Sequence, residues 1–263
     1  MCSAIHEEGD TLPNTNSIAE HSAVTSLLYT EFDAARYLRI PLWAVLLIAG
    51  DTSQRSRFKR SGWFGSTNDD FPQLPDEHYC RLSFRTLAML FVSSEVIRSH
   101  SHKFPLPWRY RDVLLRFEEI RRASGSFEPD PRWFTEPDWV LGVFGAILHP
   151  EREADQTQLL KQILLHQSRV EQKDGIPIRL FPFSRDPATE APRTIVIDPE
   201  IRFGRPTVKG APTDVLVERW RAGDRCIELA EDYGLTVDEV EEALRYETQP
   251  DRECQFSDNH LFV

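Results

Sequence analysis

The last quarter of the chain carries the most regular pattern in the sequence. Three amphipathic stretches, DVLVERWRAG, RCIELAEDYG and TVDEVEEALRYE, follow one another, and the first two end at Gly223 and Gly234. Glycine is common just past the C-terminus of a helix, because it adopts the left-handed conformation without steric cost. Thr236 and Glu239 have the spacing of a capping box at the start of the third stretch. A three-helix module over residues 193–248 is therefore predicted.

A second pair of short helices is predicted near the N-terminus. Thr30 and Asp33 have capping-box spacing at the start of TEFDAARYL, and Pro41 opens LWAVLLIAG, which ends at Gly50. The small and apolar positions of this pair match those of the last two C-terminal helices, starting with Ala35 against Ala230. Both pairs are therefore interpreted as helix-turn-helix units that share a packing geometry.

The charge is distributed unevenly along the chain. The net charge of −11 disfavours nucleic acid as a general partner, but six cations face the single anion Asp51 between residues 36 and 60. We therefore expect the N-terminal unit to bind DNA, mainly through phosphate contacts, with a solvated basic surface as the alternative. The residues expected to contact DNA are Arg36, Arg39, Trp43, Arg55, Arg57, Lys59 and Arg60.

The C-terminal helices have the opposite character. Eight carboxylates face one cation, Arg245, between residues 228 and 247. Carboxylates this dense repel the phosphates of DNA, so a helix-turn-helix here is expected to face a protein or solvent instead. Glu239 and Glu242 are the candidate partner-binding residues on its last helix.

The stretch FGRPTVKG (residues 203–210) resembles a phosphate-binding loop at first sight. In a Walker loop the lysine follows the second glycine, whereas Lys209 precedes Gly210 here, and Pro206 lacks the amide that a phosphate nest would use. The stretch is therefore predicted to be a rigid entry segment built on Gly204, Pro206 and Gly210, with Arg205 and Lys209 exposed for a partner.

The fold is predicted to be mainly α. Composition and pattern divide the rest of the chain into four further segments. Residues 1–25 are expected to be a flexible arm, 26–125 a helix-turn-helix domain, 126–192 a connector with a helix and a small β-hairpin, and 249–263 a tail. The hairpin is expected to turn at Asp174-Gly175. The proline- and aromatic-rich stretch FEPDPRWFTEPDW is expected to be a packed loop, and Ser83 to cap a long helix.

No pattern in the sequence indicates catalysis. GxSxG, HExxH and the P-loop are absent, and the four cysteines form no CxxC pair. We therefore expect a protein that is not an enzyme and uses no cofactor or metal. The longest apolar run, IPLWAVLLIAG, is too short to span a bilayer, and the acidic N-terminus is unlike a secretory signal. A cytoplasmic location without membrane contact is expected.

The stretch from Ile197 to Tyr246 resembles a small bacterial domain, domain of unknown function 433. The carrying features are the extended lead-in with Asp-Pro, the spacing of Gly204, Pro206 and Gly210, and the acidic helix-turn-helix that follows. The resemblance implies a three-helix, homeodomain-like fold and an association with antitoxins.

The whole layout is similar to larger VapB-type antitoxins, in which a winged or MerR-like helix-turn-helix precedes this domain. That resemblance implies an antitoxin of a type II toxin–antitoxin system. Such a protein would neutralise a PIN-like ribonuclease toxin and, as a homodimer, bind operator DNA to regulate its own operon. A stand-alone transcriptional regulator whose C-terminal module dimerises or senses a ligand is the alternative.

Overall fold

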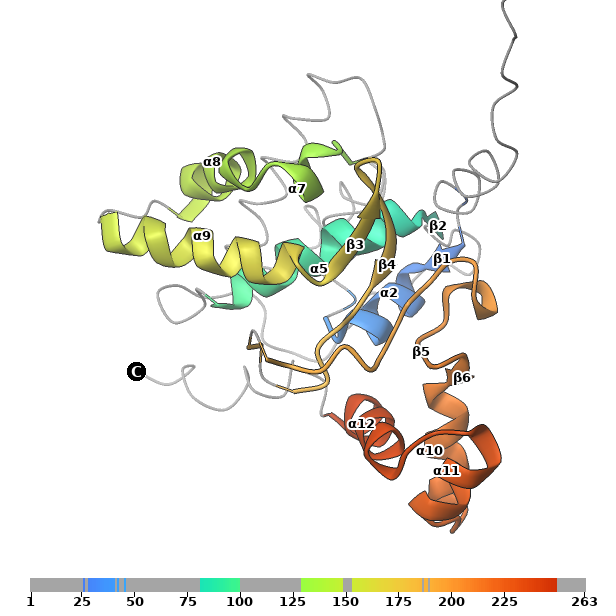
Figure 1. Cartoon of the computed structure of the whole chain (residues 1–263). Helices are drawn as coiled ribbons and strands as arrows, with labels where there is room; N and C mark the ends of the chain where they lie inside the picture. The colour runs from blue at the N-terminus through green and yellow to red at the C-terminus, as the bar shows by residue number, and fades with distance from the viewer. Residues whose placement is uncertain are drawn as a thin grey trace, which may run out of the picture.

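The structure is a computed structural model of the 263-residue chain. It describes residues 26, 28–40, 42, 45, 81–99, 129–148, 153–185, 187–188 and 190–249. Within these residues the fold is mainly helical with small antiparallel strand pairs, which confirms the predicted class (Figure 1). The predicted arm, and the predicted tail from residue 250 on, lie outside them. So does most of the predicted second N-terminal helix, of which Leu42 and Val45 are described as helical.

The larger of two apolar cores, called here the first core, is built around a central helix. Its elements are β1 (Tyr29–Thr30), α2 (Glu31–Leu38), β2 (Arg81–Leu82), α5 (Phe84–Ser99), α7 (Arg132–Thr135), α8 (Pro137–Leu148), α9 (Glu153–Gln167), β3 (Val170–Lys173) and β4 (Ile176–Leu180). Most residues of α5 are buried, because the helix packs against α2, α9 and β4. The first core thus joins segments from both halves of the chain.

Two helix starts expected from the sequence are confirmed. The Thr30 amide donates to Asp33 Oδ2 at 2.9 Å, and the Asp33 amide donates to Thr30 Oγ1 at 3.1 Å, so the capping box of α2 is complete. At the start of α5, Ser83 Oγ accepts a hydrogen bond from the Thr86 amide at 3.2 Å. Each contact satisfies an amide that has no partner inside its helix.

The stretch expected to be a packed loop forms helices instead. The short helix α7 follows Pro131, and α8 begins at Pro137. Proline fits the start of a helix, where the missing N–H would have no intrahelical partner, so these prolines open helices rather than break them. Trp133 is buried and packs edge-on against Trp139 and Phe144, with ring centroids 5.5 and 5.8 Å apart.

The predicted hairpin is confirmed. Strands β3 and β4 pair in antiparallel fashion, and Asp174 and Gly175 between them both have positive φ, at 53° and 76°. Two positive φ values suit a tight two-residue hairpin turn. In the described part of the segment 126–192, the helices and the hairpin pack into the first core.

The buried side chain of Arg169 forms hydrogen bonds with the segment that follows β4. Its guanidinium lies over the Phe183 ring, 4.5 Å from the centroid, and burial lowers its pKa to about 10. It donates hydrogen bonds to the backbone carbonyls of Phe181, Pro182, Ala191 and Pro192. The segment between Pro182 and Ala191 is thus attached to the first core at both ends.

The C-terminal module, residues 195–249, has an apolar core of its own. Its elements are η2 (Arg202–Gly204), β5 (Thr207–Val208), β6 (Ala211–Pro212), α10 (Thr213–Arg221), α11 (Cys226–Tyr233) and α12 (Val237–Thr248). The predicted caps are confirmed, since Gly234 ends α11 with a φ of 65° and Thr236 and Glu239 form the capping box of α12. Figure 1 shows the three helices gathered at one end of the molecule.

Neither a membrane span nor a metal cluster is found in the described ranges. None of their helices is long and apolar enough to cross a bilayer. The same residues contain no group of three or more His, Cys, Asp or Glu side chains placed to hold a metal ion.

Candidate functional site at the contact between the two cores

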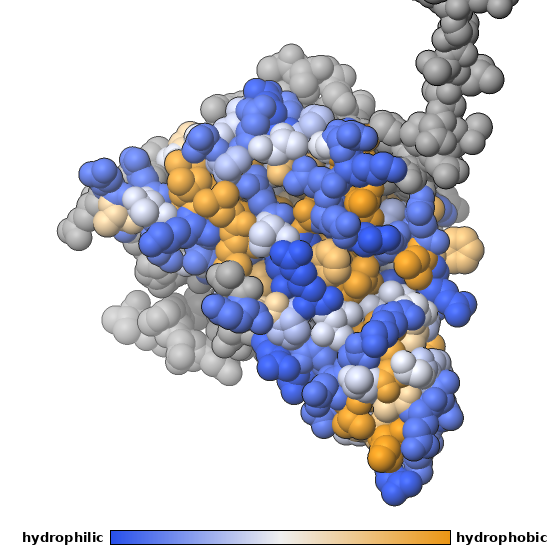
Figure 2. Space-filling view, in the orientation of Figure 1, coloured by the Kyte–Doolittle hydropathy of each residue, from blue (hydrophilic) through white to orange (hydrophobic). Residues whose placement is uncertain are grey.

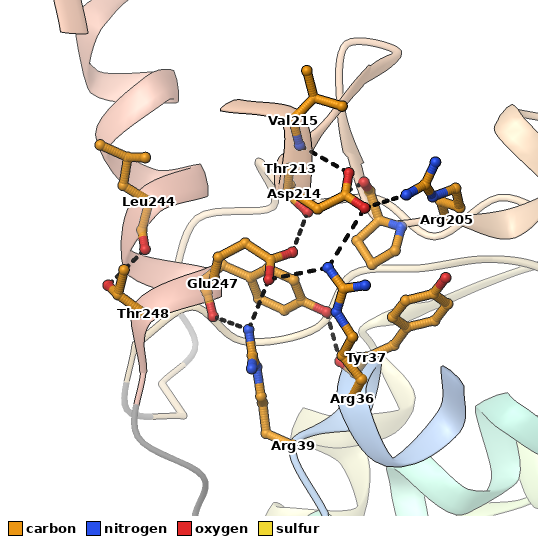
Figure 3. A network of polar contacts seen from close by, with 12 residues as sticks. Arg36, Tyr37, Arg39, Arg205, Thr213, Asp214, Val215, Leu244, Glu247 and Thr248 are labelled. Carbon is orange, nitrogen blue, oxygen red and sulfur yellow. Dashed lines mark hydrogen bonds and ion pairs between the residues drawn. The ribbon is translucent and has the colours of Figure 1, made fainter. Parts of the chain in front are cut away.

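A network of charged and polar side chains joins α2 of the first core to the C-terminal module (Figure 3). At its centre is Glu247 on α12, whose side chain is 7 % exposed. Its carboxylate accepts from Thr213 Oγ1 at 2.6 Å and from Arg39 Nη2 at 3.2 Å, and lies 3.6 Å from Arg36 Nη2. The Arg39 side chain is only 10 % exposed, so its charge depends on this contact for compensation.

Asp214 extends the network to the entry segment of the module. Its carboxylate forms an ion pair with Arg205 and lies 3.5 Å from Arg36 Nη2. Arg36 therefore contacts carboxylates on two helices, α10 and α12. The docked position of the module on α2 thus depends on charge pairing, to which Tyr246 adds buried contacts.

Tyr246 is buried at this contact. Its hydroxyl donates to the Tyr37 carbonyl at 2.6 Å, and its own carbonyl accepts from Arg39 Nη2 at 2.8 Å. The Arg39 guanidinium lies 5.3 Å from the centroid of the Tyr246 ring. Burial raises the pKa of the Tyr246 phenol, because an ionised phenolate would lose its hydration there.

Three tyrosines with raised pKa values, Tyr29, Tyr37 and Tyr246, should make the protein less stable at high pH. Burial raises the pKa of Tyr29 and Tyr246 above the ordinary 10, and that of Tyr37 to about 12. Above pH 10 the unfolded chain ionises first, so the free energy of unfolding falls as pH rises through the folded-state values. Each such group contributes about 1.4 kcal/mol per pH unit well above its unfolded pKa.

The variant Tyr246→Phe measures how much the Tyr246 phenol contributes to this loss of stability at high pH. At pH 8 the variant should lose about 1 kcal/mol with the hydrogen bond to Tyr37. Between pH 10 and 11 its stability should then fall by about 1 kcal/mol less than that of the wild type. Urea titrations at each pH measure both quantities. Equal pH slopes for the two proteins would contradict the burial of the Tyr246 phenol.

The structure describes two of the seven residues predicted to contact DNA. Arg36 and Arg39 both lie against carboxylates of the same chain rather than standing free. The other five lie outside the described residues: Trp43, Arg55, Arg57, Lys59 and Arg60. Sequence reasoning did not identify Asp214, Glu247 and Tyr246 as partners of α2, because nothing local links them to a helix about two hundred residues earlier.

The stretch FGRPTVKG lies at the contact between the module and β1 of the first core. Gly204 has a φ of 73°, and its Cα faces the Tyr29 side chain so closely that an added Cβ would overlap the phenol oxygen and ring. Arg205, next in sequence, reaches Asp214. The Pro206 carbonyl accepts a hydrogen bond from the Thr213 amide at 3.1 Å, which fixes the start of α10.

The second half of the same stretch is a tight hairpin. β5 and β6 pair across Lys209 and Gly210, whose φ values are 47° and 86°. Lys209 Nζ lies 2.9 Å from a carboxylate oxygen of Glu239, so the turn is tied to the first turn of α12. Both cations expected to be exposed for a partner, Arg205 and Lys209, are about half exposed and each has a carboxylate partner within the module.

The two candidate carboxylates on α12 have different surroundings. Glu239 is partly exposed and completes the capping box with Thr236. Glu242 is 2 % exposed and binds Arg185 at 2.5 Å, with Arg245 and Ser184 as further partners. Glu242 therefore joins α12 to the segment after β4 and offers no surface to another molecule.

A different set of residues forms the open surface of α11 and α12. Each helix exposes an apolar residue followed one turn later by a carboxylate, which places the two on one side of the helix. The single cation on α11 and α12, Arg245, is paired with Glu242. We call this set the acidic–apolar face: Ile227 and Glu231 on α11, and Val237, Asp238 and Glu241 on α12. Figure 2 shows hydrophobic residues among hydrophilic ones over this end of the molecule.

Comparison with known proteins identifies the C-terminal part. Residues 195–246 match the family model described as protein of unknown function (DUF433), which confirms the resemblance seen in the sequence for that part of the chain. The chain is similar to Rv2018 from Mycobacterium tuberculosis, known from an X-ray crystal structure. The two are 19% identical with a TM-score of 0.51, over 82% of this chain and 97% of that chain, which is a likeness of fold alone. A search of curated proteins gives no match.

Proposed function

We propose that the protein is a non-catalytic antitoxin whose C-terminal module binds a cationic protein through the acidic–apolar face. The partner implied by the resemblance to VapB-type antitoxins is a PIN-like ribonuclease. An enzyme that binds RNA must attract phosphate, so an inhibitor with a negative surface is complementary to it. The N-terminal module would bind operator DNA and so regulate expression of the pair.

The observation that carries the proposal is the composition of α12. In a helix-turn-helix the second helix is the one that enters the major groove. If α11 and α12 are a helix-turn-helix, α12 is that second helix, because it follows α11 after a short turn. Its exposed residues include Asp238 and Glu241, and no ion pair is found for either in the described part of the chain. Those carboxylates would be repelled by phosphates, whereas a basic protein surface would be attracted.

The apolar members of the face favour a protein over a small cation. Ile227 and Val237 are about half and one third exposed. Protein interfaces combine a buried apolar centre with a polar rim, and the acidic–apolar face offers both.

Operator binding through Arg36 and Arg39 requires that DNA phosphates displace carboxylates of the same chain. Arg36 and Arg39 already neutralise carboxylates of the C-terminal module, so phosphates would have to compete with Glu247 for them. The excess of cations between residues 36 and 60 supports DNA contact by this part of the chain.

Charge reversal on α12 tests the proposal. Asp238→Lys with Glu241→Lys should raise the dissociation constant for the PIN-like ribonuclease at least about tenfold, because attraction becomes repulsion at the interface. Isothermal titration and inhibition of RNA cleavage measure the effect on the full-length chain. Glu136→Lys with Glu190→Lys is the matched control, since it changes the net charge equally at exposed sites outside α11 and α12.

The result also separates the two functions left open by the sequence. Wild-type binding by the α12 variant would contradict the proposed surface. A chain that binds operator DNA but neither binds nor inhibits the ribonuclease would instead be a stand-alone regulator.

A further inference from the structure

Phe203 is the most exposed large apolar side chain in the described part of the chain, at 86 %. It lies in η2, where Arg202, Phe203 and Gly204 all have positive φ, at 51°, 58° and 73°. Side chains with a Cβ rarely adopt this left-handed region, and two in succession are strained. Both the exposure and the backbone conformation of Phe203 are therefore unfavourable for the isolated chain.

The loop that carries Phe203 is firmly held in place. The Ile201 amide donates to the Asp198 carbonyl at 3.0 Å, and the Glu200 amide donates to Asp198 Oδ1 at 2.9 Å. Asp198 is buried, and its other carboxylate oxygen accepts from Arg179 Nε at 2.8 Å. On the other side, Gly204 is seated against Tyr29. The loop therefore presents the aromatic ring in a fixed place, as a preorganised anchor for binding does.

The surroundings of Phe203 extend this surface. Ile201 is partly exposed in the same loop, and Phe32 is partly exposed on α2. Phe32 and Arg36 lie four residues apart on one side of α2, and Arg36 shares the Asp214 carboxylate with Arg205. This exposed side of α2 therefore adjoins the loop. In Figure 2 hydrophobic residues stand at the right-hand edge of the molecule, level with the β1 label of Figure 1.

The charges beside Phe203 indicate which kind of molecule can bind over its ring. Glu200 and Arg202 are both exposed, and neither has an ion pair within the described ranges. A polyanion would be repelled by Glu200 and a polycation by Arg202. A second copy related by a twofold axis meets neither problem, because Arg202 of each copy can face Glu200 of the other.

We propose that residues 200–203 and the exposed side of α2 form a twofold interface between two copies of this chain. Phe203 of each copy packs on the surface of Phe32 and Ile201 of its partner, and two Glu200–Arg202 pairs border the contact. A stable interface needs about 800 Å² from each partner, which is why the α2 side is included with the loop. A homodimer is implied by the resemblance to VapB-type antitoxins; the new element is the surface that forms it, which does not depend on a ribonuclease partner.

Self-association of the full-length chain tests the interface. Sedimentation equilibrium should give a dimer for the wild type, and Phe203→Ser should raise the dimer dissociation constant about tenfold or more. Leu164→Ser is the matched control, because Leu164 is an exposed apolar residue on α9, outside the interface, and should leave the constant unchanged.

A charge swap provides the sharper test. Glu200→Arg alone and Arg202→Glu alone should each weaken the dimer, because like charges then face each other across the axis. The double variant carrying both changes should regain most of the wild-type affinity, since the swapped charges are again complementary. Three results would overturn the interface: a monomeric wild type up to about 100 µM, an unchanged constant for Phe203→Ser, or no recovery in the double variant. A monomer whose binding of a labelled oligonucleotide depends on Phe203 would assign the ring to nucleic acid instead.

Discussion

Replacing Gly204 by alanine is expected to lower the free energy of unfolding by about 3 kcal/mol. Part of the loss is the left-handed conformation, since φ is 73° and a Cβ costs about 1–2 kcal/mol there. The rest is steric, because the added methyl would overlap the Tyr29 side chain and force the module away from the first core. Chemical denaturation monitored by circular dichroism measures the change.

Gly210→Ala is the control that separates the two causes. Gly210 also has a positive φ, at 86°, but an added Cβ would have no atom within 4 Å. Its substitution should therefore cost only the conformational part, about 1–2 kcal/mol. Equal losses for the two variants would show that the contact between Gly204 and Tyr29 contributes nothing to docking.

Glu247→Gln is expected to cost about 3 kcal/mol, the second large effect. The change keeps the shape of the side chain but leaves the buried Arg39 guanidinium without its countercharge. Breaking one side of a buried pair costs more than the pair contributes, because the remaining charge stays desolvated. Urea denaturation of the full-length chain measures this loss, and a double-mutant cycle with Arg39→Met gives the coupling between the two residues.

A surface pair is the natural comparison for Glu247. Glu228 and Arg225 form an ion pair in which both side chains are well exposed, so Glu228→Gln should change stability little. A loss at Glu247 no larger than that at Glu228 would contradict a buried contact between α2 and α12.

The sequence predicted the local structure well where a short pattern determines it. Thr30 with Asp33, Thr236 with Glu239, and Asp174-Gly175 each specify a cap or a turn within a few residues, and all are confirmed. Pro131 and Pro137 misled the prediction, because proline marks a helix start as well as a loop and only the packing of Trp133 distinguishes them.

The contact between the cores could not be predicted in the same way. An arginine at position 36 or 39 has the same sequence pattern whether it meets a phosphate or Glu247, and only the tertiary fold brings α2 to α12. The charge count also did not distinguish buried Glu242 from exposed Glu241, although the two are adjacent. The acidic character of α12 was predictable, whereas the residues open to a partner required the structure.

Hydrogen–deuterium exchange of the full-length chain, with and without the PIN-like ribonuclease, tests the central claim most directly. The amides of α11 and α12, residues 226–248, should be the most strongly protected on binding, because the acidic–apolar face lies on these helices. Protection confined to other parts of the chain, with α12 exchanging as in the free protein, would contradict the account.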